Sequence, residues 1–408
     1  MYNQKRFAVV LGLIGIQLCL VQGCRKNSHP DSHQPDPSVS SSPSSIPNSS
    51  TLPPAGFYNN ADGSPLLDVI HGAKETLDIE IYEMSDEDVK YFLRNAMARN
   101  VRVRVIKDPA PLGNPCKIFS PIESEDEKKC RDEKALKQEI LDHGGSYVPF
   151  NKIELCADSR KPCFMHGKMV IADRKTVLVS TGNFNSSNLC NQFWNPSKCN
   201  RDFTMIQDDP EVVQTLQTVF ENDLLGAKWD LKKLLDEGPR DKLTVSPFSL
   251  EPLTQLIQSA KKTIQIENQY LKDARLNRAL TDAATRGVQV RATLASVCSF
   301  GRPTERETVA ARTLFSSLEI GISLRMFPAK FKINAKPGYM HAKAIVVDHE
   351  KAWVGSVNGS TSALSNNREF GLFFDRPEWV KALSQVLDSD HFSNDVETWA
   401  ESLECRKD

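Results

Sequence analysis

The sequence lacks several features that mark particular classes of protein. It has no Cys-x-x-Cys pair and no cysteine and histidine cluster with the spacing of zinc ligands, so we expect no metal and no other cofactor. Beyond its N-terminal segment it has no apolar run long enough to span a bilayer. Residues 57–408 have a net charge of −3, from 47 Lys and Arg against 50 Asp and Glu. A nuclease without sequence preference would more often be basic, which makes a nucleic-acid substrate the less favoured one.

The N-terminal segment has the pattern of an export signal. A basic pair precedes an apolar run from Phe7 to Leu20, and Cys24 follows a small residue as in a bacterial lipobox. Residues 1–24 are therefore expected to be a signal peptide with Cys24 as the candidate for lipidation, with simple cleavage or an uncleaved anchor as alternatives. Residues 25–56 are rich in Ser and Pro and predict a disordered tether. We expect an exported protein, either a membrane-anchored lipoprotein or a periplasmic or secreted one.

Eight cysteines lie beyond Cys24, and an even number in an exported chain favours disulfides over a metal site. Connectivity cannot be read from a sequence, so the simplest prediction joins nearest neighbours. The predicted pairs are Cys116 with Cys130, Cys156 with Cys163, Cys190 with Cys199, and Cys298 with Cys405.

A short pattern of polar residues occurs twice, 175 residues apart. Its first copy reads His166-Gly167-Lys168, Asp173, Gly182-Asn183-Phe184-Asn185 and Asp202. Its second copy reads His341-Ala342-Lys343, Asp348, Gly355-Ser356-Val357-Asn358 and Glu369. A single His-x-Lys is most often an ordinary surface hairpin, but duplication with matching downstream residues favours a functional site.

The chemistry of the duplicated set suits a phosphodiester. Histidine and lysine two positions apart on a strand point to the same face, and short β-branched runs follow each lysine, as expected of a strand-turn-strand hairpin. Two such units together would supply two imidazoles, two ammonium groups and two amides to the phosphate oxygens. One imidazole could attack phosphorus while the other protonates the leaving oxygen, through a phosphohistidine. Asp202 and Glu369 are the candidates to orient the imidazoles.

These residues resemble the phospholipase D superfamily, whose signature is His-x-Lys-x4-Asp-x6-Gly-[Ser/Thr]-x-Asn in two copies. The second copy fits without deviation. The first departs from it, with eight residues between Asp173 and Gly182 and with Asn183 in place of Ser or Thr.

The resemblance implies roles for the duplicated residues. His166 and His341 would be the nucleophile and the general acid, with His166 favoured as the nucleophile. The phosphate-binding set would be Lys168, Lys343, Asn185, Asn358, Asn183 and Ser356. The structural residues of the motif would be Asp173, Asp348, Gly182 and Gly355.

Similarity between the two halves extends upstream of the motif and predicts the fold. Each half reads as helix, strand, helix, strand and then the hairpin, which indicates an α/β fold. We expect two similar phospholipase D-like lobes, residues 57–235 and 236–408, each a mixed sheet flanked by helices. A pseudo-two-fold would relate them and place the active site between them. Because one chain carries both motifs, it should be active as a monomer. Glu80 and Glu267 occupy equivalent strand positions, and a structural ion pair explains them as well as a catalytic role.

The superfamily includes phospholipases, phospholipid-making transferases and nucleases. The charge balance favours a phospholipid membrane as substrate, and the absence of spanning helices favours hydrolysis over synthesis. The sequence therefore predicts a metal-independent phospholipase D that releases head groups and leaves phosphatidic acid, with alcohol transfer as a secondary capacity. The alternatives are an exported endonuclease, a cardiolipin synthase-like transferase and an inactive protein that binds lipid or a partner. Keeping eight polar site residues without use would be costly, which argues against the inactive protein.

Overall fold

The computed structural model describes residues 51–112, 116, 118–119, 127–190, 197–299, 301–329 and 331–405, all within one compact unit. The expected signal segment with Cys24, and the tether as far as residue 50, lie outside the described residues. The folded chain starts slightly earlier than predicted, because Leu52 packs against an apolar core and Gly56 opens the first strand. Within the described ranges, no helix combines the length and the apolar character needed to cross a membrane.

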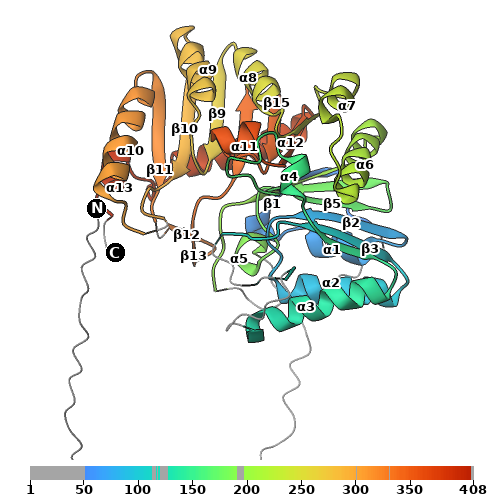
Figure 1. Cartoon of the computed structure of the whole chain (residues 1–408). Helices are drawn as coiled ribbons and strands as arrows, with labels where there is room; N and C mark the ends of the chain where they lie inside the picture. The colour runs from blue at the N-terminus through green and yellow to red at the C-terminus, as the bar shows by residue number, and fades with distance from the viewer. Residues whose placement is uncertain are drawn as a thin grey trace, which may run out of the picture. The chain divides into compact units, whose positions relative to one another are not determined.

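The described strands form two seven-stranded sheets with the same strand order (Figure 1). The first sheet has the order β1-β7-β6-β5-β2-β3-β4 and consists of β1 (Gly56–Asn59), β2 (Thr76–Ile81), β3 (Arg102–Lys107), β4 (Ser146–Pro149), β5 (Lys168–Ala172), β6 (Thr176–Ser180) and β7 (Phe203–Gln207). The second has the order β11-β10-β9-β14-β15-β16-β8 and consists of β8 (Leu243–Val245), β9 (Thr263–Asn268), β10 (Gln289–Ala295), β11 (Ile322–Phe327), β14 (Lys343–Val347), β15 (Lys351–Gly355) and β16 (Phe370–Phe374). A separate two-stranded ribbon joins β12 (Phe331–Ile333) and β13 (Lys336–Gly338).

Both sheets are mixed, as predicted. In the first, β2, β3 and β4 run parallel, whereas β5, β6, β7 and β1 add antiparallel pairs. The second repeats this arrangement with β9, β10 and β11 followed by β14, β15, β16 and β8. The predicted hairpins are the pairs β5–β6 and β14–β15, which are confirmed. The expectation of two similar α/β lobes is therefore also confirmed.

Helices cover the outer face of each sheet (Figure 1). Figure 1 shows one group on the outer side of the first sheet and another on the outer side of the second. The outer helices are α1 (Leu66–Gly72), α2 (Glu87–Ala98) and α3 (Glu127–Asp142) in the first lobe, and α8 (Leu250–Gln258), α9 (Ala274–Thr285) and α10 (Glu305–Leu318) in the second. The remaining helices are η1 (Asn60–Asp62), α4 (Lys152–Leu155), α5 (Ser186–Leu189), α6 (Pro210–Leu225), α7 (Leu231–Glu237), α11 (Thr361–Ser365), α12 (Pro377–His391) and α13 (Trp399–Ser402).

The largest apolar core is shared by the two lobes. It joins residues of both sheets with Phe220 of α6 and Leu383 of α12, whereas each outer helix group has a core of its own. Strands β5 and β14 are consequently buried along their whole length, which explains why they read as unbroken apolar runs. Because the shared core fixes one lobe on the other, residues that follow β5 and β14 in sequence can meet across the junction.

The four predicted disulfides are all confirmed. Three close short loops, Cys116–Cys130, Cys156–Cys163 and Cys190–Cys199, with sequence separations of 14, 7 and 9. The fourth, Cys298–Cys405, spans a sequence separation of 107 and ties the loop after β10 to the end of the described chain. Their Cα–Cα distances of 5.0 to 6.3 Å are ordinary for disulfides.

Candidate active site

Each motif histidine lies just before the strand that carries its lysine, and the backbone of the other lobe holds it. The amide of His166 donates to the carbonyl of Arg368 at 2.9 Å, and the amide of His341 donates to the carbonyl of Arg201 at 3.1 Å. These bonds belong to two isolated parallel bridges, Met165 with Arg368 and Arg201 with Met340. The residue just before the carboxylate of each motif therefore positions the histidine of the other motif.

The motif carboxylates contact the imidazoles, and each pair joins the two lobes. His166 Nδ1 lies 2.8 Å from Glu369 Oε2, and His341 Nδ1 lies 2.8 Å from Asp202 Oδ1. Both carboxylates are fully buried, while the histidine side chains are 15% and 5% exposed. A carboxylate at Nδ1 fixes that nitrogen as the donor and leaves Nε2 as the atom available to a substrate. The expected contacts are present, and their crossing between lobes was not visible in the sequence.

Neighbouring side chains hold each carboxylate in place. Thr181 Oγ1 donates to Asp202 Oδ1 at 2.6 Å, and Asn188 Nδ2 donates to Asp202 Oδ2 at 2.5 Å. In the other half, Asn367 Nδ2 donates to Glu369 Oε1 at 3.0 Å. The two asparagine bonds satisfy the oxygen atoms that the imidazoles do not use, and the threonine bond adds to the oxygen that His341 contacts, so the carboxylates have little freedom to rotate.

The two lysines are buried next to the imidazoles, and nearby carboxylates offset only part of the cost of burying their charge. Lys168 donates to the carbonyl of His166, and Lys343 donates to the carbonyls of His341 and, at 3.4 Å, Thr181. Burial lowers the pKa of Lys168 to about 8 and that of Lys343 to about 7, although nearby carboxylates act in the opposite direction. A site whose ammonium groups are this poorly stabilised gains when an anion binds.

The imidazoles are held in the neutral form. Burial lowers the pKa of His341 to about 4, and the positive charge of Lys343 lowers it further, against the opposing effect of Asp202. Burial also lowers the pKa of His166, which Glu369 partly offsets. Near neutral pH both histidines therefore have an unprotonated Nε2, and a bound phosphate would favour protonation of one of them.

The strand register corrects the alignment of the asparagines in the two motifs. Met169 pairs with Val179 in the first lobe, and Ala344 pairs with Val354 in the second. Counting onward from these pairs, Asn183 occupies the position of Asn358. The sequence alignment had instead matched Asn185 to Asn358 and Gly182 to Gly355. The first copy thus has the regular spacing of six residues after its aspartate, with serine at position 180 in place of glycine.

Hydrogen bonds support this register. The amide of Phe203 donates to Thr181 Oγ1 at 2.9 Å, and the amide of Phe370 donates to Ser356 Oγ at 3.1 Å, so these two hydroxyls are equivalent. Two residues further on, the side-chain oxygens of Asn183 and Asn358 are both buried, and neither accepts a hydrogen bond from the described residues. Two buried acceptor oxygens at equivalent positions, with no donor among the described residues, indicate a ligand site, and the amide nitrogens of the same side chains are the donors available to a phosphate.

Asn185 caps a helix, and the register gives the position expected for phosphate binding to Asn183 instead. The side-chain oxygen of Asn185 accepts from the amide of Asn188 at 3.0 Å and caps helix α5. The equivalent cap in the second lobe is Ser360, which accepts from the amide of Ala363 and starts α11. Asn, Ser and Asp are the usual residues at this helix position, which accounts for both choices.

The remaining motif residues have the structural roles that were expected. Asp173 and Asp348 both have φ of +54° and accept backbone hydrogen bonds from the segment before the neighbouring strand, including Glu75 at 2.7 Å and Lys262 at 2.7 Å. Gly182 is needed for space, because a Cβ there would lie 2.9 Å from Asp202 Oδ2. Gly355 similarly packs against the backbone of β16.

A comparison with known families fits this geometry. The family model described as "Cardiolipin synthase, PLD-like domain" matches residues 66–224 and 253–391. The chain belongs to this phospholipase D-like family. Both matched segments carry one histidine, one lysine and one carboxylate of the site. The chain is thus placed among phospholipase D-like enzymes.

The curated relatives of this phospholipase D-like chain include cardiolipin synthases. A probable cardiolipin synthase of Bacillus subtilis (strain 168) is 26% identical over 296 residues, which cover 65% of this chain and 52% of that protein. Cardiolipin synthase A of Pseudomonas entomophila (strain L48) is 32% identical over 162 residues, which cover 39% of this chain and 31% of that protein. The chain therefore spans about half the length, or less, of these relatives.

Solved structures share the two-lobed phospholipase D-like fold. Phosphatidylserine synthase from Haemophilus influenzae Rd KW20 has a TM-score of 0.59 at 14% identity, over 86% of this chain and 89% of that one. Polyphosphate kinase from Porphyromonas gingivalis has a TM-score of 0.52 at 13% identity, over 80% of this chain and 47% of that one. At these identities the likeness concerns the fold alone.

Sequence reasoning missed aromatic and acidic residues at the mouth of the site. The ring of Tyr82 lies 4.9 Å from that of His166, and the ring of Tyr339 lies 5.5 Å from that of His341. Glu83 Oε2 lies 3.5 Å from Asn183 Nδ2. Tyr82 and Glu83 directly follow β2, which pairs with the lysine-bearing strand β5. That adjacency is the signal that would have found them.

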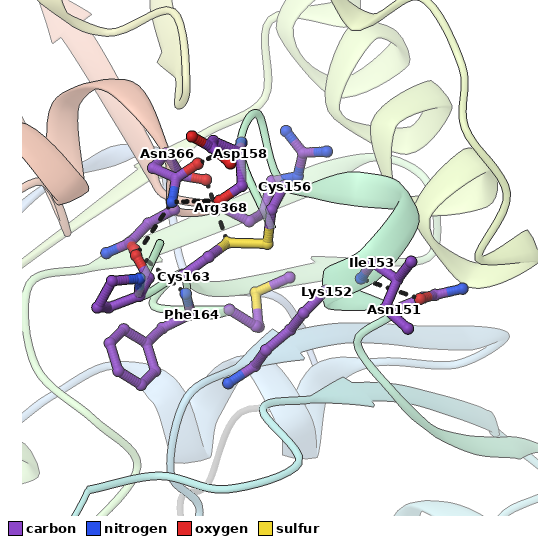
Figure 2. Close-up of a disulfide and its surroundings, with 12 residues drawn as sticks. Asn151, Lys152, Ile153, Cys156, Asp158, Cys163, Phe164, Asn366 and Arg368 are labelled. Atoms are coloured by element: carbon purple, nitrogen blue, oxygen red, sulfur yellow. Dashed lines mark hydrogen bonds between the residues drawn. A yellow bond between two sulfur atoms is a disulfide. The ribbon is translucent and has the colours of Figure 1, made fainter. Parts of the chain in front are cut away.

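The disulfide before the first motif also reaches the second lobe. Figure 2 shows Cys156–Cys163 with Asp158 and Asn366 beside it. The side chain of Asn366 accepts from the amide of Asp158 at 2.7 Å and donates to the carbonyls of Asp158 and Pro162 at 3.2 and 3.0 Å. The disulfide loop therefore fastens the segment before His166 to the segment before Glu369.

Glu80 and Glu267 lie outside the group of site residues and belong to buried acid clusters. Burial raises the pKa of Glu80 well above its usual value, with Asp223 acting in the same direction. Burial and Asp390 do the same for Glu267. A neutral carboxyl forms no ion pair, so each glutamate stands beside a second buried acid where the sequence suggested a structural ion pair. Within the described residues no group of three or more His, Cys, Asp or Glu side chains could hold a metal ion.

Proposed function

We propose that the protein is a phosphatidyltransferase of the cardiolipin synthase type, which moves a phosphatidyl group from one alcohol to another through a phosphohistidine. The observation that carries the chemistry is the pair of crossed imidazole–carboxylate contacts around two buried lysines. The names of the curated relatives support transfer over hydrolysis. Because the chain spans only part of those relatives, this assignment needs a direct test.

The first step would form a phosphohistidine. Nε2 of His166, unprotonated and held by Glu369 at Nδ1, attacks phosphorus of a phospholipid head group such as phosphatidylglycerol. The bond from phosphorus to the head-group oxygen breaks, and His341, which takes up a proton at Nε2 when the anionic diester binds, gives that proton to the oxygen. Lys168 and Lys343 stabilise the charge on the non-bridging oxygens, aided by the amides of Asn183 and Asn358.

The second step would return the phosphatidyl group to an alcohol. A hydroxyl of a second phosphatidylglycerol attacks phosphorus, and its proton passes to His341, which was left unprotonated by the first step. The bond from phosphorus to His166 breaks, which regenerates the free enzyme. The products are cardiolipin and glycerol. Water in place of the alcohol would give phosphatidic acid, so transfer requires that the acceptor outcompete water.

The expectation of hydrolysis is the one that the comparisons support less. It rested on the lack of membrane-spanning segments. Such segments determine how a protein reaches a membrane, but they do not determine whether water or an alcohol accepts the phosphatidyl group. Both reactions use the same residues and the same intermediate, and they differ only in the second nucleophile. The relatives named as synthases therefore outweigh the argument from missing spans.

We also propose that the enzyme works outside the cytoplasm at a lipid surface. The four disulfides support an oxidising compartment, and the N-terminal signal pattern with Cys24 supports export and lipid anchoring. Because each imidazole is oriented by a carboxylate of the same chain, a monomer has every site residue it needs. Mass spectrometry of the membrane fraction would test the lipid on Cys24, and sedimentation of the active enzyme would test the monomer.

The deciding experiment gives the full-length, oxidised protein vesicles of phosphatidylglycerol in EDTA and measures the lipid products by mass spectrometry. We expect cardiolipin and glycerol from the wild type and neither from His166→Ala or His341→Ala. Phosphatidic acid without cardiolipin would replace transfer by hydrolysis. Cleavage of single-stranded DNA in a parallel reaction, with no lipid turnover, would move the enzyme to the nucleases. No turnover of either substrate would support a binding protein.

A phosphodiester with a p-nitrophenyl leaving group would test the assignment of the two histidines. This leaving group departs without protonation, so a variant that lacks only the general acid should still form the covalent intermediate. We expect His341→Ala to release one burst of p-nitrophenol per enzyme and His166→Ala to release none. The reverse pattern would make His341 the nucleophile.

A further inference from the structure

The pseudo-two-fold places two chemically opposite residues at equivalent points on the rim of the site. Met84 bridges to Phe184 just after Asn183, and Leu271 bridges to Gly359 just after Asn358. The residues that precede these bridges, Glu83 and Tyr270, are therefore counterparts. The groups that surround phosphorus are nearly the same in the two halves. The halves differ at Glu83 and Tyr270, which we call the two rim residues.

Glu83 brings a negative charge to a site built for an anion. Its carboxylate lies 3.5 Å from the amide nitrogen of Asn183 and is partly buried. The same charge raises the pKa of Lys168 against the larger effect of burial, so it acts on the phosphate-binding lysine. A carboxylate here repels phosphate oxygens but accepts hydrogen bonds from hydroxyl or ammonium groups. Its position suits the part of a substrate that carries such donors.

Tyr270 instead leads into an apolar cavity. A cavity of about 450 Å³ opens between the loops that follow β9 and β10 and helix α10. Its walls include Leu271, Leu294, Leu314 and Phe315. Pockets of 300 to 1,000 Å³ with apolar walls are typical of small-molecule sites, so this one is large enough for a substantial apolar group.

Cationic groups stand at the edge of the cavity nearest to the phosphate-binding turn. Lys272 Nζ lies 4.5 Å from the centre of the Tyr270 ring, and the amide of Lys272 donates to the carbonyl of Gly359 at 2.6 Å. Arg302 and Glu307 also line the cavity and are exposed, so two cations face one carboxylate there. An apolar interior with a cationic edge beside Asn358 complements a lipid chain attached to a phosphate.

Tyr339 lies beside the second histidine, and burial raises its pKa. Its ring is 5.5 Å from that of His341. The contact of Glu83 with Asn183 and the bond from the Lys272 amide to Gly359, which follows Asn358, place the carboxylate and the edge of the cavity next to the two asparagines.

We propose that the difference between Glu83 and Tyr270 sorts the two arms of the phosphodiester, with an acyl chain in the cavity behind Tyr270 and the hydroxyl-bearing head group at Glu83. This inference rests on the proposed phosphatidyl transfer and adds the orientation of the substrate to it. A pseudo-symmetric site would otherwise accept the diester in either direction. Glu83 and the cavity remove that ambiguity. In the reverse orientation the acyl chain would lie beside a carboxylate, and the head-group hydroxyls would lack hydrogen-bond partners in the apolar cavity.

Filling the cavity tests the acyl half of the proposal. Ala311 lines the cavity from α10, so Ala311→Trp should occupy it. We expect kcat/KM for a long-chain phosphatidylglycerol to fall about tenfold or more, since the variant excludes the chain. Bis(p-nitrophenyl) phosphate has no acyl chain, and its turnover should change less than about twofold. The control is Val309→Trp, which adds the same side chain at a position on α10 that is 59% exposed.

Neutralising Glu83 tests the head-group half. Phosphatidylmethanol has the phosphate and the acyl chains of phosphatidylglycerol but no hydroxyl in its head group. We expect the wild type to prefer phosphatidylglycerol and Glu83→Gln to reduce that preference about tenfold, because an amide accepts the hydroxyl hydrogen bond more weakly than a carboxylate. Glu75→Gln is the matched control, since this exposed carboxylate lies at the other end of β2.

The outcomes separate this inference from the proposed function. If the wild type turns over bis(p-nitrophenyl) phosphate but no lipid, the phosphatidyl transfer fails. If the wild type turns over lipid but Ala311→Trp lowers the turnover of both substrates equally, or of neither, the proposed acyl site is wrong. Loss of DNA cleavage alone in Ala311→Trp would mean that the cavity holds a base. A preference unchanged in Glu83→Gln would overturn the head-group site. Circular dichroism and thermal unfolding of each variant would exclude misfolding as the cause.

Discussion

Glu369 of the second lobe accepts a hydrogen bond from Nδ1 of His166 in the first lobe at 2.8 Å. The reciprocal pair, Asp202 with His341, has the same length. Each half of the chain therefore completes the catalytic group of the other, and neither lobe alone holds an oriented imidazole. Each lobe supplies one histidine and one carboxylate, and each histidine contacts the carboxylate of the other lobe.

Replacing either orienting carboxylate by its amide should reduce the rate far more than it reduces binding. Glu369→Gln and Asp202→Asn are each expected to lower kcat by roughly 10²- to 10⁴-fold, because an amide can hold the imidazole in the wrong tautomer. Steady-state kinetics with bis(p-nitrophenyl) phosphate would measure this. A fall in the rate of less than tenfold, with normal thermal unfolding, would contradict an orienting role.

The corrected register predicts which asparagine binds phosphate. Asn183→Ala should lower kcat/KM by roughly 10- to 100-fold, as should Asn358→Ala, since each removes a donor to a charged group. Asn185→Ser keeps a helix cap of the kind that Ser360 provides in the second lobe, so its activity should stay within about twofold of the wild type. Strong loss in Asn185→Ser with normal activity in Asn183→Ala would restore the original alignment.

The buried lysines should make stability depend on pH. The folded pKa of Lys343 is about 7, below its usual 10.5, so the unfolded chain binds more protons between these values. The free energy of unfolding should therefore rise with pH through this window, and the cost of burying the charge is complete below pH 7. Lys343→Met should show a smaller rise when urea unfolding is compared at pH 7 and pH 9. An equal rise in the free energy of unfolding of the wild type and the variant would show that a group other than Lys343 titrates.

Anion binding should reverse that effect. Inorganic phosphate in the site favours the charged lysines, so its binding at pH 8 should take up about one proton. Calorimetry in two buffers with different ionisation enthalpies would count the protons. Lys343→Met should take up fewer, whereas identical uptake in wild type and variant would contradict the assignment of the proton to this lysine.

The lobes are fastened by two buried arginine–aspartate pairs that cross between them. Arg368 Nε donates to Asp223 Oδ2 at 2.6 Å, and Arg201 Nη2 donates to Asp390 Oδ1 at 2.8 Å. Arg368→Met leaves Asp223 without its partner and should destabilise the protein by roughly 3–5 kcal/mol in denaturant unfolding. Arg174→Met removes an exposed arginine and should cost less than about 1 kcal/mol. Similar costs for the two variants would contradict the clamp.

Among the disulfides, Cys298–Cys405 should contribute most to stability. Its loop is the longest, with a sequence separation of 107 against 9 for Cys190–Cys199. The loop-entropy model predicts a loss of about 5 kcal/mol for Cys298→Ser with Cys405→Ser, and about 3 kcal/mol for the short loop. Urea unfolding of the two double variants would measure the difference. The opposite ranking would show that native contacts outweigh loop length.

The sequence predicted the features that depend on local pattern. The apolar runs after Lys168 and Lys343 specified the buried hairpins, because both faces of these strands meet cores. Pairing neighbouring cysteines succeeded for the three short loops, since these bring thiols together with little loss of entropy, and Cys298 with Cys405 was then the remaining pair. The repeated block upstream of the motif specified two lobes of one design. In these cases the information lies within a few residues of the structure it determines.

The tertiary structure alone decided the features that depend on pairing across the chain. Strand register matches Asn183 rather than Asn185 to Asn358, at the same offset of 175 residues as the histidines, because pairing follows position along the strand whereas the sequence comparison had followed residue type. Glu369 faces His166 because the lobes share a core, which no local pattern encodes. The sequence by itself determined the duplicated histidines, lysines and carboxylates of the site. Packing between the lobes decided which of them touch, because contacts between distant segments follow from the fold of the whole chain.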